Sequence, residues 1–137
     1  MATRLVSDLL HSKDAQVFSI GSEVTVQEAL ETMVAKGISS LAVTSGAALI
    51  GIVSERDYIR KAVPRRIVPW EIRVQDIMTR EVICVTRDDT IQTCMERMST
   101  NRIRHLPVVD GTALVGMLSI SDVVRALRLA RIEFPAA

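Results

Sequence analysis

Aromatic side chains are scarce in this chain of 137 residues: they make up 3% of it, with a single tryptophan. Proteins that bind single-stranded nucleic acid stack bases on aromatic platforms, so that class is disfavoured. The net charge of +1 also lacks the basic excess of a nucleic-acid binder. We therefore expect no nucleic-acid partner, and we expect any planar ligand to be held mainly by aliphatic and methionine side chains.

Cysteine is nearly absent as well. Cys84 and Cys94 have neither the C-x-x-C spacing nor the clustered histidines of metal and redox sites, so we interpret both as small core residues and expect no metal. No uninterrupted apolar run approaches the roughly 20 residues that span a bilayer, and the first residues do not resemble a secretion signal. These absences predict a soluble cytoplasmic protein without a membrane partner. A hydrophobic content of 48% excludes a disordered chain.

The chain does contain an internal repeat. Residues 17–62 align with residues 82–127 at a constant offset of 65, with 15 identities in 46 positions. Unrelated segments would give about 3. Each copy ends in a similar phrase, Gly51-Ile52-Val53-Ser54-Glu55-Arg56-Asp57 or Gly116-Met117-Leu118-Ser119-Ile120-Ser121-Asp122. The repeated phrase is the best indication of function.

Periodicity predicts the order β-α-β-β-α in each copy. The first copy is expected to have strands at 17–20, 41–44 and 49–53, a helix at 25–36 ended by Gly37, and a helix from Ser54. The second is expected to have strands at 82–85, 105–109 and 114–118, a helix at 90–100, and a helix from Ser119. A short helical lead, 5–10 or 74–78, precedes each first strand, and prolines make 63–73 an irregular connector.

The expected parts are a first repeat at 5–62, the connector at 63–73, a second repeat at 74–130 and a tail at 131–137. A unit of about 60 residues buries only about 60% of its unfolded surface by itself. We therefore expect an α/β (α+β) fold in which the two repeats share a core about a pseudo-twofold axis. Paired clefts at their interface are the expected ligand sites.

The repeated Ser-x-x-Asp phrase has two interpretations. A serine followed by an acid is first of all a helix N-cap, which stabilises a helix by about 1 kcal/mol. Alternatively, the hydroxyl and the carboxylate bind a ligand at a strand-to-helix junction, where backbone N–H groups are free to meet an anion. The glycine before the serine would let that ligand approach the backbone. The occurrence of the phrase in both copies favours a ligand site.

The chain resembles a tandem pair of cystathionine β-synthase (CBS) domains, a Bateman module, over about residues 5–130. The resemblance is carried by Asp76-Ile77-Met78-Thr79, by Ile103-Arg104-His105-Leu106-Pro107-Val108-Val109-Asp110 and by the two Gly-h-h-Ser-x-x-Asp phrases, in which h is an apolar residue. It implies a regulatory fold that binds adenine nucleotides such as AMP, ADP, ATP or NAD(H) and has no catalytic cofactor. It also implies a homodimer that acts on a separate, unidentified protein.

The resemblance implies that Asp57 and Asp122 accept hydrogen bonds from the ribose hydroxyls, and that Thr79 contacts the sugar or phosphate. An ionised acceptor strengthens each such bond to roughly 1.5 to 3 kcal/mol. Adenine would meet the backbone beside the first strand of each repeat. The full set of expected nucleotide-binding residues is Val17, Ser19, Ser39, Ser54, Arg56, Asp57, Thr79, Val82, Cys84, Arg104, His105, Pro107, Ser119, Ser121 and Asp122.

The two repeats differ in the basic side chains that could bind the phosphates of a nucleotide. The second has Arg104-His105 at the start of a strand, either as a phosphate contact or as a solvated strand end. The first has Ser39-Ser40 there, and Arg56 is a candidate substitute. A basic run is either a solvated face or a means of steering phosphates; it consists of Arg56, Arg60, Lys61, Arg65 and Arg66.

Three functions remain to be compared. The first is a nucleotide-sensing regulatory module. The second is an enzyme with Cys84 and His105 as nucleophile and base, but the sequence has no orienting third group and no phosphate-binding glycine loop, so we expect no catalysis. The third is a structural dimerisation module with degenerate clefts, against which the retained Asp57 and Asp122 argue.

Overall fold

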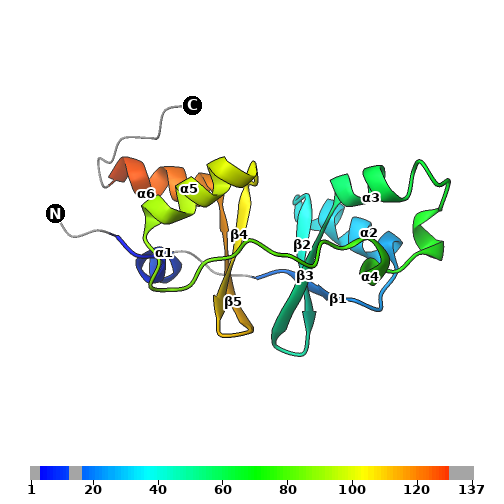
Figure 1. Ribbon diagram of the computed structural model, residues 1–137, viewed down its shortest axis with the longest axis horizontal. Helices are drawn as coiled ribbons and strands as arrows, with labels where there is room; N and C mark the ends of the chain where they lie inside the picture. Colours follow the sequence, from blue (N-terminus) through cyan, green and yellow to red (C-terminus); the bar gives the residue numbers. More distant parts are fainter. Residues whose placement is uncertain (1–3, 13–16, 130–137) are drawn as a thin grey trace. The chain divides into compact units, whose positions relative to one another are not determined.

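The computed structural model describes residues 4–12 and 17–129. These residues divide into two compact units, one made of residues 4–12, 17 and 83–129 and the other of residues 18–82. In each unit the helices lie on one side of the strands, as Figure 1 shows. The mixed α/β architecture predicted from the sequence is confirmed, with the predicted elements in the predicted order except for one strand.

The unit of residues 18–82 contains the first repeat. Its elements are β1 (Ser19–Gly21), α2 (Val26–Lys36), β2 (Ser40–Ser45), β3 (Ala48–Ser54), α3 (Glu55–Lys61), a 3₁₀ turn η1 (Pro69–Glu71) and α4 (Val74–Ile77). β1 runs parallel to β2, and β2 pairs antiparallel with β3. The predicted stop of α2 is confirmed, because Gly37 adopts a φ of 65° that glycine reaches without steric cost.

The other unit contains α1 (Val6–Ser12), α5 (Ile91–Asn101), β4 (His105–Asp110), β5 (Ala113–Ser119) and α6 (Ile120–Leu129). β4 and β5 form an antiparallel hairpin. Gly46 and Gly111 both take positive φ in the turns between the paired strands of their units. The expected tail at 131–137 lies outside the described residues.

The strand predicted at 82–85 is wrong. Only Val85 pairs with β4, in an isolated parallel bridge to Val108. Its N–H donates to the Pro107 carbonyl at 3.0 Å, and its own carbonyl accepts from Val109 at 2.9 Å. Proline has no N–H to donate, so β4 cannot extend this ladder towards residue 83. The first repeat has Ala42 at the corresponding position, and β1 forms beside it.

Each unit has a buried apolar cluster of its own. The lead segment of the first repeat, in α1, places Val6 and Leu9 in the cluster of the unit that contains the second repeat. Conversely, Val74 and Ile77 of α4, the lead of the second repeat, are buried in the unit that contains the first. Each lead helix therefore packs against the core of the other repeat.

Candidate functional site

The first Ser-x-x-Asp phrase forms the junction between β3 and α3. Asp57 Oδ2 accepts hydrogen bonds from the Ser54 backbone N–H at 2.9 Å and from the Ser54 hydroxyl at 3.0 Å. The Asp57 N–H in turn donates to Ser54 Oγ at 3.1 Å. This reciprocal pair is a capping box, so the helix-capping interpretation is confirmed for this turn.

The other oxygen of Asp57 is directed to residues outside the turn. Oδ1 lies 3.3 Å from the Thr79 hydroxyl, which donates to it, and 3.2 Å from the ammonium group of Lys61. Lys61 Nζ also donates to the carbonyl oxygen of Ile77 at 2.7 Å. The Asp57 side chain is 13% exposed. The turn thus brings together Ser54, Asp57 and Thr79, three of the expected nucleotide-binding residues, and adds a lysine.

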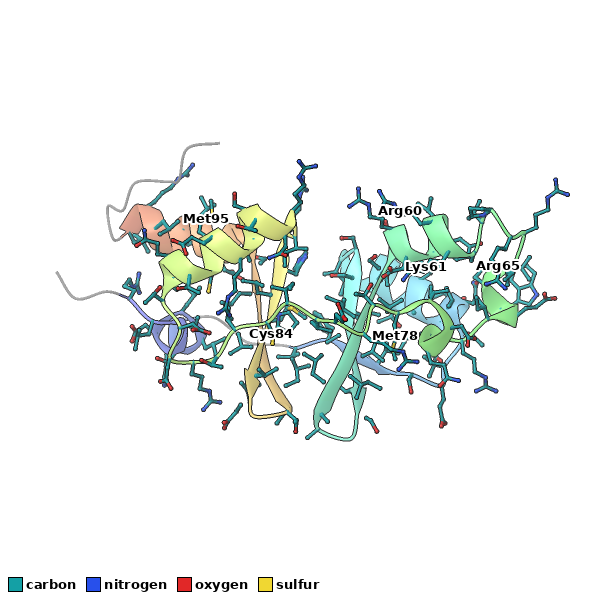
Figure 2. All side chains as sticks on the ribbon, viewed as in Figure 1. Arg60, Lys61, Arg65, Met78, Cys84 and Met95 are labelled. Carbon is teal, nitrogen blue, oxygen red and sulfur yellow. The ribbon has the colours of Figure 1, made fainter. Side chains whose placement is uncertain are left out.

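Backbone pairing holds Thr79 in this position. The N–H groups of Ile52 and Thr79 donate to each other's carbonyls at 2.9 and 2.8 Å. A Cβ on Gly51 would lie 2.8 Å from Met78 Sδ and 3.0 Å from Thr79 O. The glycine therefore admits the lead segment of the second repeat, and not a ligand as the sequence suggested. Figure 2 labels Met78 and Lys61 in this unit.

The second Ser-x-x-Asp phrase repeats the cap at the start of α6. Asp122 Oδ2 accepts from the Ser119 N–H at 2.8 Å, and the Asp122 N–H donates to Ser119 Oγ at 3.1 Å. Asp122 is 9% exposed. The β4–β5 register places His105 opposite Ser119, and the Ile120 N–H donates to the carbonyl of Arg104 at 2.8 Å. The predicted basic pair is thus adjacent to this turn.

The remaining predicted residues differ in their exposure and in their distance from the two turns. In the unit of the first repeat, the carbonyl of Ser39 accepts from the Glu55 N–H at 3.1 Å, while Ser19 and Arg56 are exposed and Val82 is half-buried. In the other unit, Ser121 is exposed on the first turn of α6, Pro107 is buried in β4, and Val17 and Cys84 are half-buried. Val17 and Ser19 belong to different units, as do Val82 and Cys84, so their shared role stays a prediction.

The two cysteines have different surroundings. Cys94 is fully buried in α5, as predicted, and burial raises the pKa of its thiol to about 11, with the nearby Asp89 carboxylate adding to the effect. Cys84 is half-buried and outside any strand. Its carbonyl accepts a hydrogen bond from Arg97 Nη1 at 2.7 Å. The backbone at Cys84, part of the segment expected to meet adenine, thus already accepts one hydrogen bond from a side chain.

Lys61 is the site residue that sequence reasoning overlooked, because it was counted only as part of a basic run. The signal was available in its spacing. Asp57 and Lys61 are four residues apart, and a carboxylate followed by a lysine at this distance forms an ion pair on a helix.

Across residues 4–12 and 17–129, no group of three or more His, Cys, Asp or Glu side chains could hold a metal ion. None of the helices in these stretches is long and apolar enough to cross a membrane.

Comparisons with known proteins are consistent with this arrangement. The chain is 37% identical over 131 residues to the CBS domain-containing protein CBSX3, mitochondrial, of Arabidopsis thaliana, an alignment covering 89% of this chain and 64% of that protein. It spans smaller shares, 17% and 32%, of two other curated relatives. The name of the Arabidopsis protein places that protein in mitochondria, so a cytoplasmic location for this chain stays a prediction.

Two solved structures share the fold along most of their length. A CBS domain structure described as NE2398 matches with a TM-score of 0.84 and 35% identity, covering 93% of this chain and 99% of that one. The CBS domain protein PAE2072 from Pyrobaculum aerophilum, complexed with AMP, matches with a TM-score of 0.78 and 29% identity, covering 92% and 96%. The CBS domain family model matches residues 6–63 and 74–129, and the chain therefore belongs to the CBS domain family of regulatory modules.

Proposed function

We propose that this chain is a regulatory module that binds an adenine nucleotide and thereby alters its affinity for a separate protein. The observation that carries the proposal is the duplicated carboxylate at a strand-to-helix junction, Asp57 in one unit and Asp122 in the other. A relative of 29% identity that binds AMP supports the choice of ligand. AMP, ADP, ATP and NAD(H) are the ligands considered, and no catalysis is proposed.

The contacts of Asp57 suggest how a ribose would bind. An ionised carboxylate has about four lone-pair sites, and the four contacts of Asp57 occupy them. The two contacts to Ser54 are the shorter ones and hold the cap. The Thr79 hydroxyl makes the longest contact, 3.3 Å, and it is the one that a sugar hydroxyl would replace at least cost.

The same contacts favour one alternative, a structural dimerisation module. Both aspartates accept the N–H of the serine three residues earlier, so helix capping alone would account for their retention. The homodimer is common to both proposals. Ligand binding distinguishes them.

Calorimetry with AMP, ATP and NADH provides the test. We expect a dissociation constant in the micromolar range, about 8 kcal/mol of binding free energy, for at least one nucleotide. Asp57→Asn and Asp122→Asn should each weaken one site by about tenfold to hundredfold, because each removes a charged acceptor and preserves the shape of the side chain.

Two other aspartates provide matched controls for the loss of a helix cap. Asp76 Oδ2 accepts from the Arg73 N–H at 3.0 Å, and Asp8 Oδ2 accepts from the Leu5 N–H at 2.9 Å. Asp76→Asn and Asp8→Asn should therefore reduce stability without weakening nucleotide binding. The absence of both heat and thermal shift at millimolar nucleotide would favour the dimerisation module. Unchanged binding by both site variants would refute the ribose assignment.

A further inference from the structure

The two carboxylate turns have different cations beside them. The second repeat has Arg104-His105 at the start of β4, where the first has Ser39-Ser40. In the following helix the situation is reversed: the first repeat has Lys61 at the end of α3, and the offset of 65 places Ala126, within α6, at the corresponding position of the second. Ala126 is 2% exposed and has no charge to offer. Lys61 and the pair Arg104-His105 are thus located on different elements of their repeats.

The position of Lys61 is fixed from two sides. Its ammonium group is 2.7 Å from the Ile77 carbonyl oxygen and 3.2 Å from Asp57 Oδ1. An ammonium group has three N–H donors, so one remains after these two contacts. The Lys61 side chain is 45% exposed, which leaves that donor accessible from solvent. The Lys61 ammonium group therefore lies beside Asp57 Oδ1, the oxygen that accepts a hydrogen bond from the Thr79 hydroxyl.

The charge of Lys61 has a consequence for anionic ligands. Without it, the Asp57 carboxylate would repel a nucleotide phosphate, whereas the Lys61–Asp57 pair has no net charge. The remaining N–H donor of Lys61 can also form a charge-assisted hydrogen bond to a phosphate oxygen, which is about twice as strong as a neutral one. Arg56 was the substitute expected from the sequence. It is exposed, and the contacts that define the site come from Lys61.

We propose that Lys61 is the cation that binds the phosphate in the first nucleotide site. It takes the role that Arg104-His105 has in the second site. The two sites thus select anionic ligands through side chains on different elements. This inference rests on the proposed function. It predicts that removal of the lysine weakens the binding of ligands that carry a phosphate more than the binding of adenosine, which loss of packing or stability would not do.

The experiment measures the first site while the second is weakened. In an Asp122→Asn background, calorimetry with adenosine, AMP and ATP is compared with and without Lys61→Met. We expect AMP and ATP to bind about tenfold more weakly without the lysine, the effect of one lost charge-assisted hydrogen bond, and adenosine to change less than about threefold. Lys61→Arg should restore most of the AMP affinity because it keeps the charge.

Arg60→Met is the matched control, since Arg60 precedes Lys61 on the same helix. Figure 2 shows the two labels on opposite sides of α3, with Lys61 on the side of Met78. Loss of this neighbouring charge should change AMP affinity less than about twofold if only a local contact matters. Thermal melts of each variant check folding.

The outcomes separate the two proposals. If the parent protein binds none of the three ligands, the proposed function fails and the lysine has no ligand to select. If AMP binds but Lys61→Met leaves its affinity unchanged, or weakens all three ligands equally, the role assigned to Lys61 is wrong while the proposed function stands. An equal effect of Arg60→Met would indicate general attraction by the basic run, and would also overturn the inference.

Discussion

The two oxygens of the Asp57 carboxylate bind different parts of the protein. Oδ2 caps α3 through Ser54, and Oδ1 links the turn to Thr79 and Lys61. The repeated Ser-x-x-Asp phrase predicted the cap directly, because capping depends on residues three positions apart. The contact with Thr79 spans 22 residues of sequence, and the resemblance to CBS domains assigned Thr79 only to the sugar or phosphate of a ligand. Local contacts in the site were therefore predictable from the residues, whereas long-range contacts required the fold.

The cysteines provide a prediction at the same scale. Burial, together with Asp89, raises the pKa of Cys94 to about 11 from an ordinary value of 9.0. In single-cysteine variants at pH 8, a thiol reagent should therefore modify the half-buried Cys84 rapidly, and Cys94 only as the protein unfolds. Comparable rates for the two thiols in the native protein would contradict this.

The same pKa shift predicts a dependence of stability on pH. Between pH 9 and 11 the unfolded chain releases the Cys94 proton while the folded protein keeps it, so the stability that this group contributes is lost as pH rises. Urea denaturation across this range should show a smaller loss for Cys94→Ala than for the parent. The comparison cancels the titration of lysine and tyrosine, which both proteins share.

At the scale of elements, the glycine of the repeated phrase provides a test of packing. Gly51 has ordinary backbone geometry, but an added Cβ would lie 2.8 Å from Met78 Sδ. Gly51→Ala should therefore lower the free energy of unfolding by about 1 to 3 kcal/mol, the usual effect of overpacking. Gly21→Ala is the control, because nothing lies within 4 Å of a Cβ at Gly21. Equal effects of the two substitutions in chemical denaturation would refute the packing role of Gly51.

Two elements show where sequence patterns were insufficient. Gly37 predicted the end of α2, but the residue that follows and caps α5 is Arg102, which adopts the left-handed conformation with a φ of 54° and gave no such signal. The strand predicted at 82–85 failed because its apolar pattern was read without its partner. Pro107 was visible in the sequence, but that it lies beside this segment depends on the register of the fold.

At the scale of the whole molecule, the sequence repeat differs from the packed unit. The Val6 N–H donates to the Asp89 carbonyl at 2.8 Å, and the Val74 N–H donates to the Val24 carbonyl at 2.9 Å. The two contacts correspond, since Asp89 and Val24 are 65 residues apart in the aligned repeats. Each lead segment thus docks on the other repeat through the same hydrogen bond. Internal similarity predicted two alike units, but it could not predict which lead belongs to which core.

Because each lead segment docks on the other repeat, a core mutation in a lead segment should destabilise the repeat on which that segment docks. Val6 and Val74 are both 0% exposed, so truncation of either to alanine should cost on the order of 2 kcal/mol. In hydrogen exchange, Val6→Ala should reduce the protection of α5 and α6, which belong to the second repeat, and leave α2 unchanged. Val74→Ala should have the reciprocal effect and expose α2. Loss of protection in α2 for Val6→Ala would instead mean that each lead packs on its own repeat, and would contradict the exchanged arrangement.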